Sequence, residues 1–383
     1  MRCLIIKHQA FHCYDDMAQA CMENGVQILS ESVTSPEDAQ RVLAKVDRFR
    51  PDFILNYPSF LSLVSQIGAM RGIPVFHWVV DKVLDPEHIK PDSFADTDHI
   101  FAACRSDVAE YRRIGVKSRY FPNSCNIAGD DYSRYDKIYN VSYVGTIELG
   151  ENNYYRQFVR EIRHSVTTPQ EEQNLEQLIH VLEVALSRQA EASKRFVYIL
   201  PDLVSKILDT VGDAFPGISP HELTAILTKE TCFHQRRHFL ERIPQLDVFG
   251  PEDWTRAPLP NVRYHGVVNL RESGRVFAAS TINLSISRVY SQDGLSDRIF
   301  NVLYAGGFLL TNRQETISEL FQEGVDLEAY ATVEELLDKI AFYENHPQAR
   351  EGIARRGHEN VIRNHTFNNR IRTMLPLLTR WDG

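Results

Sequence analysis

The chain has 383 residues, of which 43% are hydrophobic and 24% charged, and its formal net charge is −9. A chain of this length exceeds the size at which one hydrophobic core stops growing, so we expect two domains. The acidic balance, with a sequence pI of about 5.9, argues against nucleic acid as the main partner but leaves room for a local basic pocket that binds a small phosphate ligand.

The ends of the chain and its cysteines indicate a cellular compartment. We find no apolar run long enough to cross a bilayer, and the apolar run that follows Met1 is too short for a signal peptide. The cysteines form no CxxC pair, which is typical of buried thiols in a reducing compartment. They are Cys3, Cys13, Cys21, Cys104, Cys125 and Cys232. The sequence therefore predicts a cytoplasmic protein.

The first part of the chain alternates short apolar strands with amphipathic helices. This alternation predicts a parallel sheet covered by helices on both faces. Strands are expected at 3–8, 26–33, 52–58, 73–80, 99–104 and 118–124. Helices are expected at 14–25, 35–49, 59–72 and 106–115. In the second helix, Ser35 would be the cap and Pro36 would take the first position.

A second alternating unit begins near Tyr139. A strand at 139–144 leads into a helical insertion over about 152–243, in which apolar residues recur at three- and four-residue spacing. Strands resume at 246–250, 262–266, 281–287 and 307–312, and the chain from 332 onward is helical almost throughout. We therefore predict an α/β chain of two Rossmann-like domains, 1–138 and 139–365, and a last helix in 366–383 that returns to the first domain. The ligand would bind in the cleft between the domains, at the carboxyl ends of the strands.

The stretch SQDGLSDRIFNVLYAGGFLLTN, residues 291–312, places a polar cluster directly before an apolar helix. A helix start exposes unpaired N–H groups and a partial positive charge. Gly294 would let a ligand approach the backbone, Ser296 or Asp297 would cap the helix, and Arg298 adds a full charge. The pattern favours a phosphate site, although a capped core helix beside a surface arginine would give the same letters.

This stretch, together with the helical segment that follows it up to residue 370, resembles the CgeB/YkvP-like glycosyltransferases. They are a branch of the GT-B superfamily related to retaining family four, and the resemblance covers roughly 247–370. It implies two Rossmann-like domains facing a cleft, a nucleotide-sugar donor (a UDP-sugar is expected) and no metal or other cofactor. The acceptor would be a glycan, a protein or a small molecule, and the helical insertion could form a homo-oligomer.

In related enzymes the loop and helix carry two glutamates, one touching the donor sugar and the other the ribose. The matching positions here hold Asp293 and Asn301. Asp293 keeps a carboxylate on a shorter arm, whereas Asn301 loses the charge but still forms hydrogen bonds. The departure leaves ribose binding, and full activity, open.

Further candidates line the same predicted cleft. Arg288 and Tyr290 precede the loop, and Gly145 and Thr146 match the glycine turn that opens the second domain of the superfamily. A glycine there allows backbone N–H groups to face a diphosphate. Glu148 follows, and it would either contact an acceptor or, as the default interpretation, be an exposed loop carboxylate.

In the first domain, His77 and Asp81 lie near the end of the strand at 73–80. The superfamily often places a His or an Asp there, facing the donor sugar or the acceptor, and histidine has a pKa suited to proton transfer. A half-buried structural histidine beside Trp78 is the alternative. Asn123 and Ser124 form another strand-end turn and would bind a ligand or only shape the turn.

The sequence contains neither a metal-binding HExxH motif nor a P-loop, and the segment His234 to His238 is interpreted as a basic helix patch. The leading hypothesis is a metal-independent glycosyltransferase with Asp293, Asp81 and His77 as catalytic candidates. Two alternatives remain open, namely a GT-B-shaped epimerase or hydrolase of the nucleotide sugar and a non-catalytic sugar- or nucleotide-binding protein.

Overall fold

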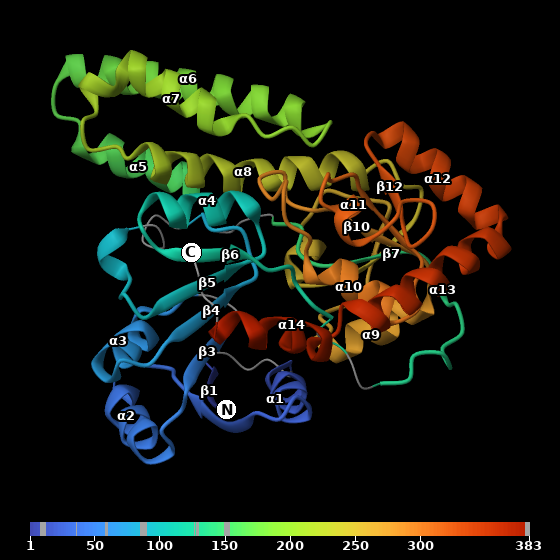
Figure 1. The fold of residues 1–383 in the computed structure, drawn as a ribbon. Helices are drawn as coiled ribbons and strands as arrows, with labels where there is room; N and C mark the ends of the chain where they lie inside the picture. Colours follow the sequence, from blue (N-terminus) through green and yellow to red (C-terminus); the bar gives the residue numbers. More distant parts are fainter. Residues whose placement is uncertain are drawn as a thin grey trace.

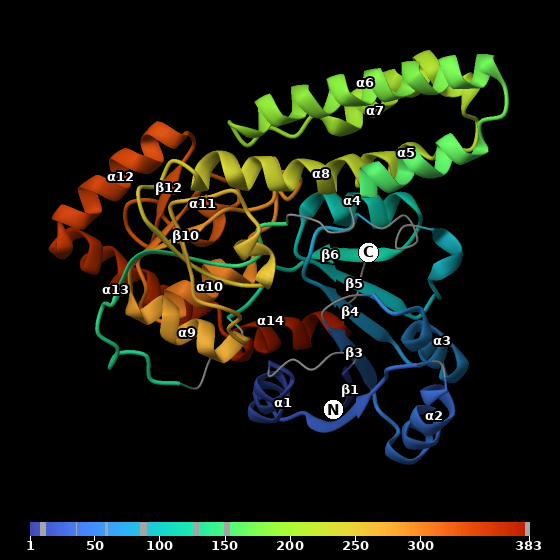
Figure 2. The same ribbon diagram turned by 180° about the vertical axis from the view of Figure 1, so that it is seen from behind.

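The computed structural model describes residues 1–7, 13–35, 37–57, 60–84, 90–125, 127, 130–148 and 154–379. These residues form two lobes, each built on a six-stranded parallel sheet (Figure 1). Turning the molecule by 180° shows the same two lobes from behind, with α14 lying between them (Figure 2). This arrangement confirms the predicted fold class of two Rossmann-like domains.

The first lobe has the strand order β2-β1-β3-β4-β5-β6. Its strands are β1 (Arg2–Lys7), β2 (Gln27–Ser32), β3 (Phe53–Tyr57), β4 (Val75–Val79), β5 (Asp98–Ala102) and β6 (Lys117–Tyr120). Its helices are α1 (Cys13–Glu23), α2 (Asp38–Phe49), α3 (Ser62–Arg71) and α4 (Arg105–Arg113). Side chains alternate between the faces of β1, so that Cys3 and Ile5 join one core and Leu4 and Ile6 the other.

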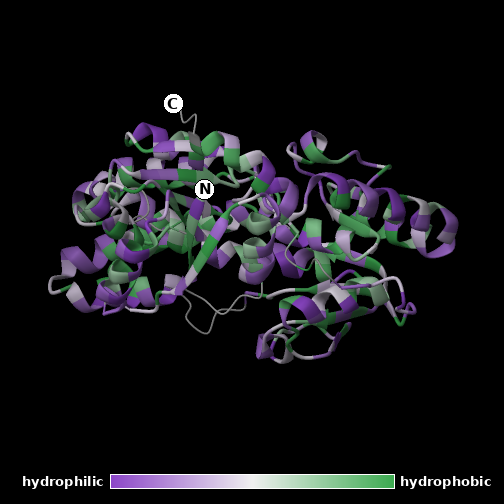
Figure 3. Ribbon diagram, turned by 60° about the horizontal axis from the view of Figure 1, so that its bottom comes forward, coloured by the Kyte–Doolittle hydropathy of each residue, from purple (hydrophilic) through white to green (hydrophobic). Residues whose placement is uncertain are grey.

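The second lobe has the order β12-β11-β10-β7-β8-β9. Its strands are β7 (Tyr139–Val144), β8 (Leu246–Phe249), β9 (Val262–Tyr264), β10 (Ser280–Ser285), β11 (Leu309–Asn312) and β12 (Glu328–Tyr330). Its helices are α9 (Leu270–Ala279), α10 (Asp297–Tyr304), α11 (Ile317–Leu320), α12 (Val333–Asn345) and α13 (Pro347–Asn364). Hydrophobic colour concentrates on the strands, and the outer helices alternate between the two colours (Figure 3).

The helical insertion follows β7. It comprises α5 (Tyr154–Ser165), α6 (Pro169–Ser193), α7 (Leu200–Val211) and α8 (Pro220–Leu240). Helices α6, α7 and α8 share a hydrophobic core of their own, which includes Leu182, Val204 and Leu227. Figure 1 shows α6 and α7 as an outer pair beyond α5 and α8. The long α8 therefore connects this separate helical core with the second lobe.

The chain passes between the lobes twice, and the two crossings are tied together. The first crossing follows β6, and the second leads into α14 (Phe367–Thr379), whose Ile371 and Met374 pack into the first lobe's core. The Cys125 N–H donates to the His365 carbonyl at 3.1 Å, and Arg370 Nε donates to the Asn123 carbonyl at 3.0 Å.

Two details differ from the sequence-based expectations. Helix α2 begins at Asp38 rather than at the predicted cap Ser35, because the Asp38 carboxylate accepts the Thr34 and Ser35 N–H groups at 2.8 and 3.2 Å and keeps this turn outside the helix. Pro36, expected in the first helical position, lies outside the described residues. Strand β12, paired with β11, was not predicted because three residues give too short an alternation.

Candidate functional site

A cavity of about 210 Å³ lies between the lobes, at the carboxyl ends of their strands. We call it the interlobe cavity. The first lobe contributes residues 80–82 after β4 and 103–104 after β5, and the second contributes 145–146 after β7 and residues of the segment 286–298 that links β10 to α10. Eight predicted site residues meet there: Asp81, Gly145, Thr146, Arg288, Tyr290, Gly294, Ser296 and Arg298.

Three arginines line this cavity, and two of them pair with the Glu148 carboxylate beside it. Arg236 reaches the cavity from α8, and its Nη1 donates to both the carbonyl oxygen and Oγ1 of Thr146 at 2.8 Å. The Glu148 carboxylate pairs with Arg236 at 3.0 Å and with Arg288 Nε at 2.8 Å. Burial alone would raise the pKa of Glu148, but Arg236 and Arg288 lower it below its ordinary value. The two guanidinium groups share this single carboxylate, which leaves guanidinium N–H groups for an anionic ligand, while Asp81 and Asp297 are the carboxylates on the cavity walls.

Arg298, the third arginine, lies over the ring of Tyr143 with 5.4 Å between its guanidinium carbon and the ring centroid. A side chain at Gly145 would place its Cβ 2.7 Å from Arg298 Nη2, so glycine there leaves room for the guanidinium. Within the ranges that the structure describes, Arg298 forms no ion pair with a carboxylate. Its charge therefore remains available to a ligand in the interlobe cavity.

The first turn of α10 completes the anion site. Ser296 is the N-cap residue, yet its hydroxyl does not cap the helix. Ser296 Oγ is buried against the cavity and has no hydrogen-bond partner among the described residues. Helix starts present free N–H groups and a partial positive charge, and an unsatisfied buried hydroxyl costs stability unless a ligand satisfies it.

Arg236 and Glu148 take part in the site although the sequence analysis did not include them among the expected ligand-binding residues. Arg236 belongs to the segment that we interpreted only as a basic helix patch, and only 4% of its surface is exposed. Glu148 was taken as an exposed loop carboxylate, whereas it lies between two arginines with a left-handed backbone, φ 58°. Backbone strain of this kind is often found at functional sites.

Asp293 and Gly294 contact the first lobe at the junction between the two lobes. The Asp293 carboxylate accepts the backbone N–H of Ser106 at 2.5 Å and its hydroxyl at 3.1 Å, so it caps α4 of the opposite lobe. A Cβ on Gly294 would lie 2.5 Å from Cys104 Sγ and 2.6 Å from the Ala103 carbonyl oxygen. The glycine therefore lets the two lobes approach, rather than a ligand as the sequence suggested.

His77 and Asn301 do not line the interlobe cavity. His77 is fully buried in β4, with its ring nitrogens 2.9 Å from Asn56 Nδ2 and 3.2 Å from the Asp98 carboxylate. These contacts satisfy both nitrogens, so we assign His77 a structural role and do not retain it as a catalytic residue. Asn301 is buried within α10. In the strand-end turn that contains Asn123, the side chain contacts protein backbone rather than a ligand. Asn123 Nδ2 donates to the Leu295 carbonyl at 2.9 Å.

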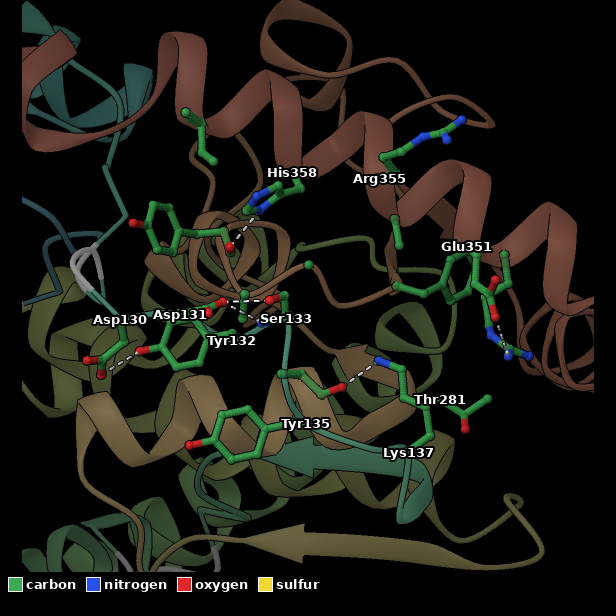
Figure 4. Close-up of a pocket in the computed structure, with 18 residues that line it drawn as sticks. Asp130, Asp131, Tyr132, Ser133, Tyr135, Lys137, Thr281, Glu351, Arg355 and His358 are labelled. Carbon is green, nitrogen blue, oxygen red and sulfur yellow. Dashed lines mark hydrogen bonds and ion pairs between the residues drawn. The ribbon is translucent and has the colours of Figure 1, made fainter.

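Two further cavities lie outside this site. One, of about 1060 Å³, includes Asp293 and the residues that follow β11. The other, of about 470 Å³, lies at the amino ends of β7 and β10 and is shown in Figure 4, where Lys137 and Thr281 face α13 with its His358. Neither shares a lining residue with the interlobe cavity.

The described residues include neither a metal-binding cluster nor a membrane-spanning helix. They contain no group of three or more His, Cys, Asp or Glu residues placed to hold a metal ion. None of their helices has the length and apolar character needed to span a membrane. All six cysteines are buried, as the sequence predicted.

Comparison with known proteins places this geometry in context. Residues 234–376 match a family model described as "Glycosyl transferase-like". No curated protein is significantly similar to the chain. Solved structures with similar folds include Anabaena HepE in complex with UDP-glucose, at 12% identity and a TM-score of 0.52, covering 99% of this chain and 100% of that one.

Two further structures are similar over nearly the whole chain. Sucrose-phosphate synthase from Thermosynechococcus elongatus has 10% identity and a TM-score of 0.53, covering 99% of this chain and 98% of that one. Phage T4 BGT, described with its UDP-glucose substrate, has 10% identity and a TM-score of 0.52, with coverages of 100% and 97%. At such identities the comparison establishes the fold alone. The chain has the GT-B fold, as the sequence predicted.

Proposed function

We propose that the chain is a glycosyltransferase that moves a sugar from a nucleotide-sugar donor to an acceptor in the interlobe cleft. The observation that carries the proposal is the group of three arginines that line the interlobe cavity near the start of α10. Arg236 and Arg288 share the single Glu148 carboxylate, and Arg298 forms no ion pair among the described residues. A diphosphate is the anion that this arrangement fits, since it satisfies both the helix N–H groups and the guanidinium groups.

The proposed reaction breaks the bond between the anomeric carbon of the donor sugar and its diphosphate oxygen. Arg298, Arg236 and the α10 N–H groups would hold the charge that develops on the leaving diphosphate, so that no metal ion is needed. A hydroxyl of the acceptor forms the new bond to the anomeric carbon. For retention, this hydroxyl attacks from the face that the diphosphate leaves, and its proton passes to the departing diphosphate oxygen. Asp81, exposed on the opposite wall of the cavity, would accept a hydrogen bond from the acceptor and orient it.

Finer assignments belong to the same proposal. UDP is the proposed nucleotide, supported by the UDP-glucose complexes of HepE and BGT. Retention of the anomeric configuration and a place among the CgeB/YkvP-like enzymes are supported by the resemblance of residues 247–370. A cytoplasmic location is supported by the burial of all six cysteines, whose spacing includes no CxxC pair.

The test is nucleotide release from UDP-, GDP- and dTDP-sugars with and without acceptors. The Arg298→Gln variant is expected to lower kcat by about 10²- to 10³-fold, the usual effect of losing a group that stabilises developing charge. Arg113→Gln is the matched control, because Arg113 is an exposed residue on α4 that pairs with Glu110.

Each outcome has a definite meaning. Release that requires an acceptor supports a transferase. Release or conversion without any acceptor indicates a hydrolase or an epimerase. Binding of UDP without turnover of any donor indicates a nucleotide-binding protein, and failure of all three nucleotides to bind rejects the proposal.

A further inference from the structure

A second hollow lies beside the cleft, between the helical insertion and the first lobe. We call this cavity of about 490 Å³ the α5/α8 groove. Its lining includes Tyr154 and Phe158 from α5, Ile226 from α8, and Leu84 from the segment after β4. The volume lies within the range of small-molecule sites, and the four side chains offer apolar surface.

Two parts of the chain, the segment after β4 and helix α8, contribute residues to both the α5/α8 groove and the interlobe cavity. Asp81 lines the interlobe cavity and Leu84 the groove, and three residues of chain span at most about 10 Å. On α8, Lys229 lines the groove and Arg236 the interlobe cavity. Seven residues correspond to about two helical turns, so these two side chains lie on one face of α8, about 10 Å apart along its axis.

The residues that line the groove indicate which kind of ligand it can bind. Lys229 Nζ lies 4.1 Å from the centroid of the Tyr154 ring, which holds that ring as one side of the groove. Glu161, Glu222 and Gln157 provide carboxylate and amide oxygens, and Gln157 Nε2 donates to Glu161 at 2.9 Å. The two carboxylates outnumber the single lysine, which disfavours an anionic ligand and favours a neutral one that carries hydroxyl groups.

We propose that the α5/α8 groove binds the acceptor through a flat apolar ring, while the hydroxyl-bearing part of the same molecule reaches Asp81. The acceptor class is therefore a neutral aryl glycoside or a comparably amphipathic hydroxyl compound about 10 Å long. This inference rests on the proposed function, because it assumes a donor in the interlobe cavity. It also assigns a role to the insertion, whose α5 and α8 form one side of the acceptor site.

The test compares the binding of 4-nitrophenyl β-D-glucopyranoside and methyl β-D-glucopyranoside to the full chain in the presence of UDP, by calorimetry or saturation-transfer NMR. The aryl glycoside is expected to bind about tenfold more tightly, because its ring leaves water for the groove. Tyr154→Ala and Ile226→Gln are each expected to reduce that preference at least threefold without changing the affinity for UDP. Phe342→Ala is the control, since Phe342 is an exposed aromatic residue on α12.

The outcomes separate this inference from the proposed function. If UDP binds but the two glycosides bind equally, or if Tyr154→Ala and Ile226→Gln both leave the preference unchanged, the acceptor assignment is overturned. If UDP fails to bind while the aryl preference exists and disappears in the variants, the groove is supported and the donor site is wrong. Thermal unfolding of each variant identifies a loss of folding, and Tyr154, 45% exposed, is the substitution that should preserve it.

Discussion

Glu148 is the residue on which the charge balance of the site depends. It is the negative partner of Arg236, which is almost completely buried, and of the half-buried Arg288. Burial lowers the pKa of Arg288, but Tyr290, Glu148 and Asp81 together raise it above its ordinary value. In the free protein, the Glu148 carboxylate therefore holds Arg236 and Arg288 together. A bound diphosphate would supply further negative charge to the arginines of the site.

Glu148→Gln is expected to lower the free energy of unfolding by about 3 kcal/mol, because it leaves buried guanidinium charge without its partner. UDP should stabilise this variant more than the parent, since the phosphates replace the lost charge. Thermal unfolding with and without UDP measures both effects. Glu110→Gln, which removes an exposed pair with Arg113, should change stability by less than about 0.5 kcal/mol. Equal shifts in the two variants would contradict this account of the cluster.

At the scale of elements, the loop between β10 and α10 acts on both lobes. Ser296 at its end and Arg298 in the adjoining first turn of α10 face the interlobe cavity, whereas Asp293 caps α4. Because α4 follows β5 of the first lobe, this cap joins the two lobes at the edge of the site. The structure thus gives the Asp293 carboxylate a positioning role, in contrast to the catalytic role expected from its place in the sequence.

Asp293→Asn separates the two roles. Asparagine caps helices about as well as aspartate, so turnover by this variant should stay within about threefold of the parent if Asp293 only positions α4. Asp293→Ala removes the cap, at a cost of about 1 kcal/mol, and should raise the KM for the donor by loosening the lobes. Steady-state kinetics of both variants measure this. A loss of kcat of a hundredfold or more in Asp293→Asn would restore the catalytic interpretation.

Much of this arrangement was predictable because the signals are local. Strands such as β4 and β7 are recognisable in the sequence, and in a parallel sheet the residues that follow the strands gather at one edge, which indicated Asp81 and Gly145. Arg298 was indicated by the polar cluster before an apolar helix and by the family resemblance. Arg236 was not predictable, since it contacts Thr146 across 90 residues of insertion. For His77 the sequence left a catalytic and a structural interpretation open, and the structure favours the structural one, because the ring nitrogens are satisfied by Asn56 and by Asp98 of a neighbouring strand.

At the scale of the whole molecule, buried histidines couple stability to pH in both parts of the structure. Burial lowers the pKa of His99, on β5 of the first lobe, to about 4, and the nearby Lys117 acts in the same direction. His365 lies where the chain crosses between the lobes, and burial together with Arg370 lowers its pKa to about 4. Both are neutral in the folded protein over a range in which an unfolded chain would protonate them.

Stability is therefore expected to be complete above the unfolded-state histidine pKa of about 6.5 and to fall as pH decreases toward 4, by up to about 1.4 kcal/mol per pH unit for each of the two residues. The direction follows because the unfolded chain binds more protons between these values. Urea unfolding at pH 7.5, 6.0 and 5.0 measures the slope. His365→Gln keeps an acceptor for the 2.8 Å contact with Arg370 Nη2 and should reduce the slope of stability against pH by about the contribution of one proton. The same substitution at the exposed His164 should leave the slope unchanged. A flat profile between pH 6.5 and 5 in the parent protein would show that the two histidines are accessible to protons in the folded state.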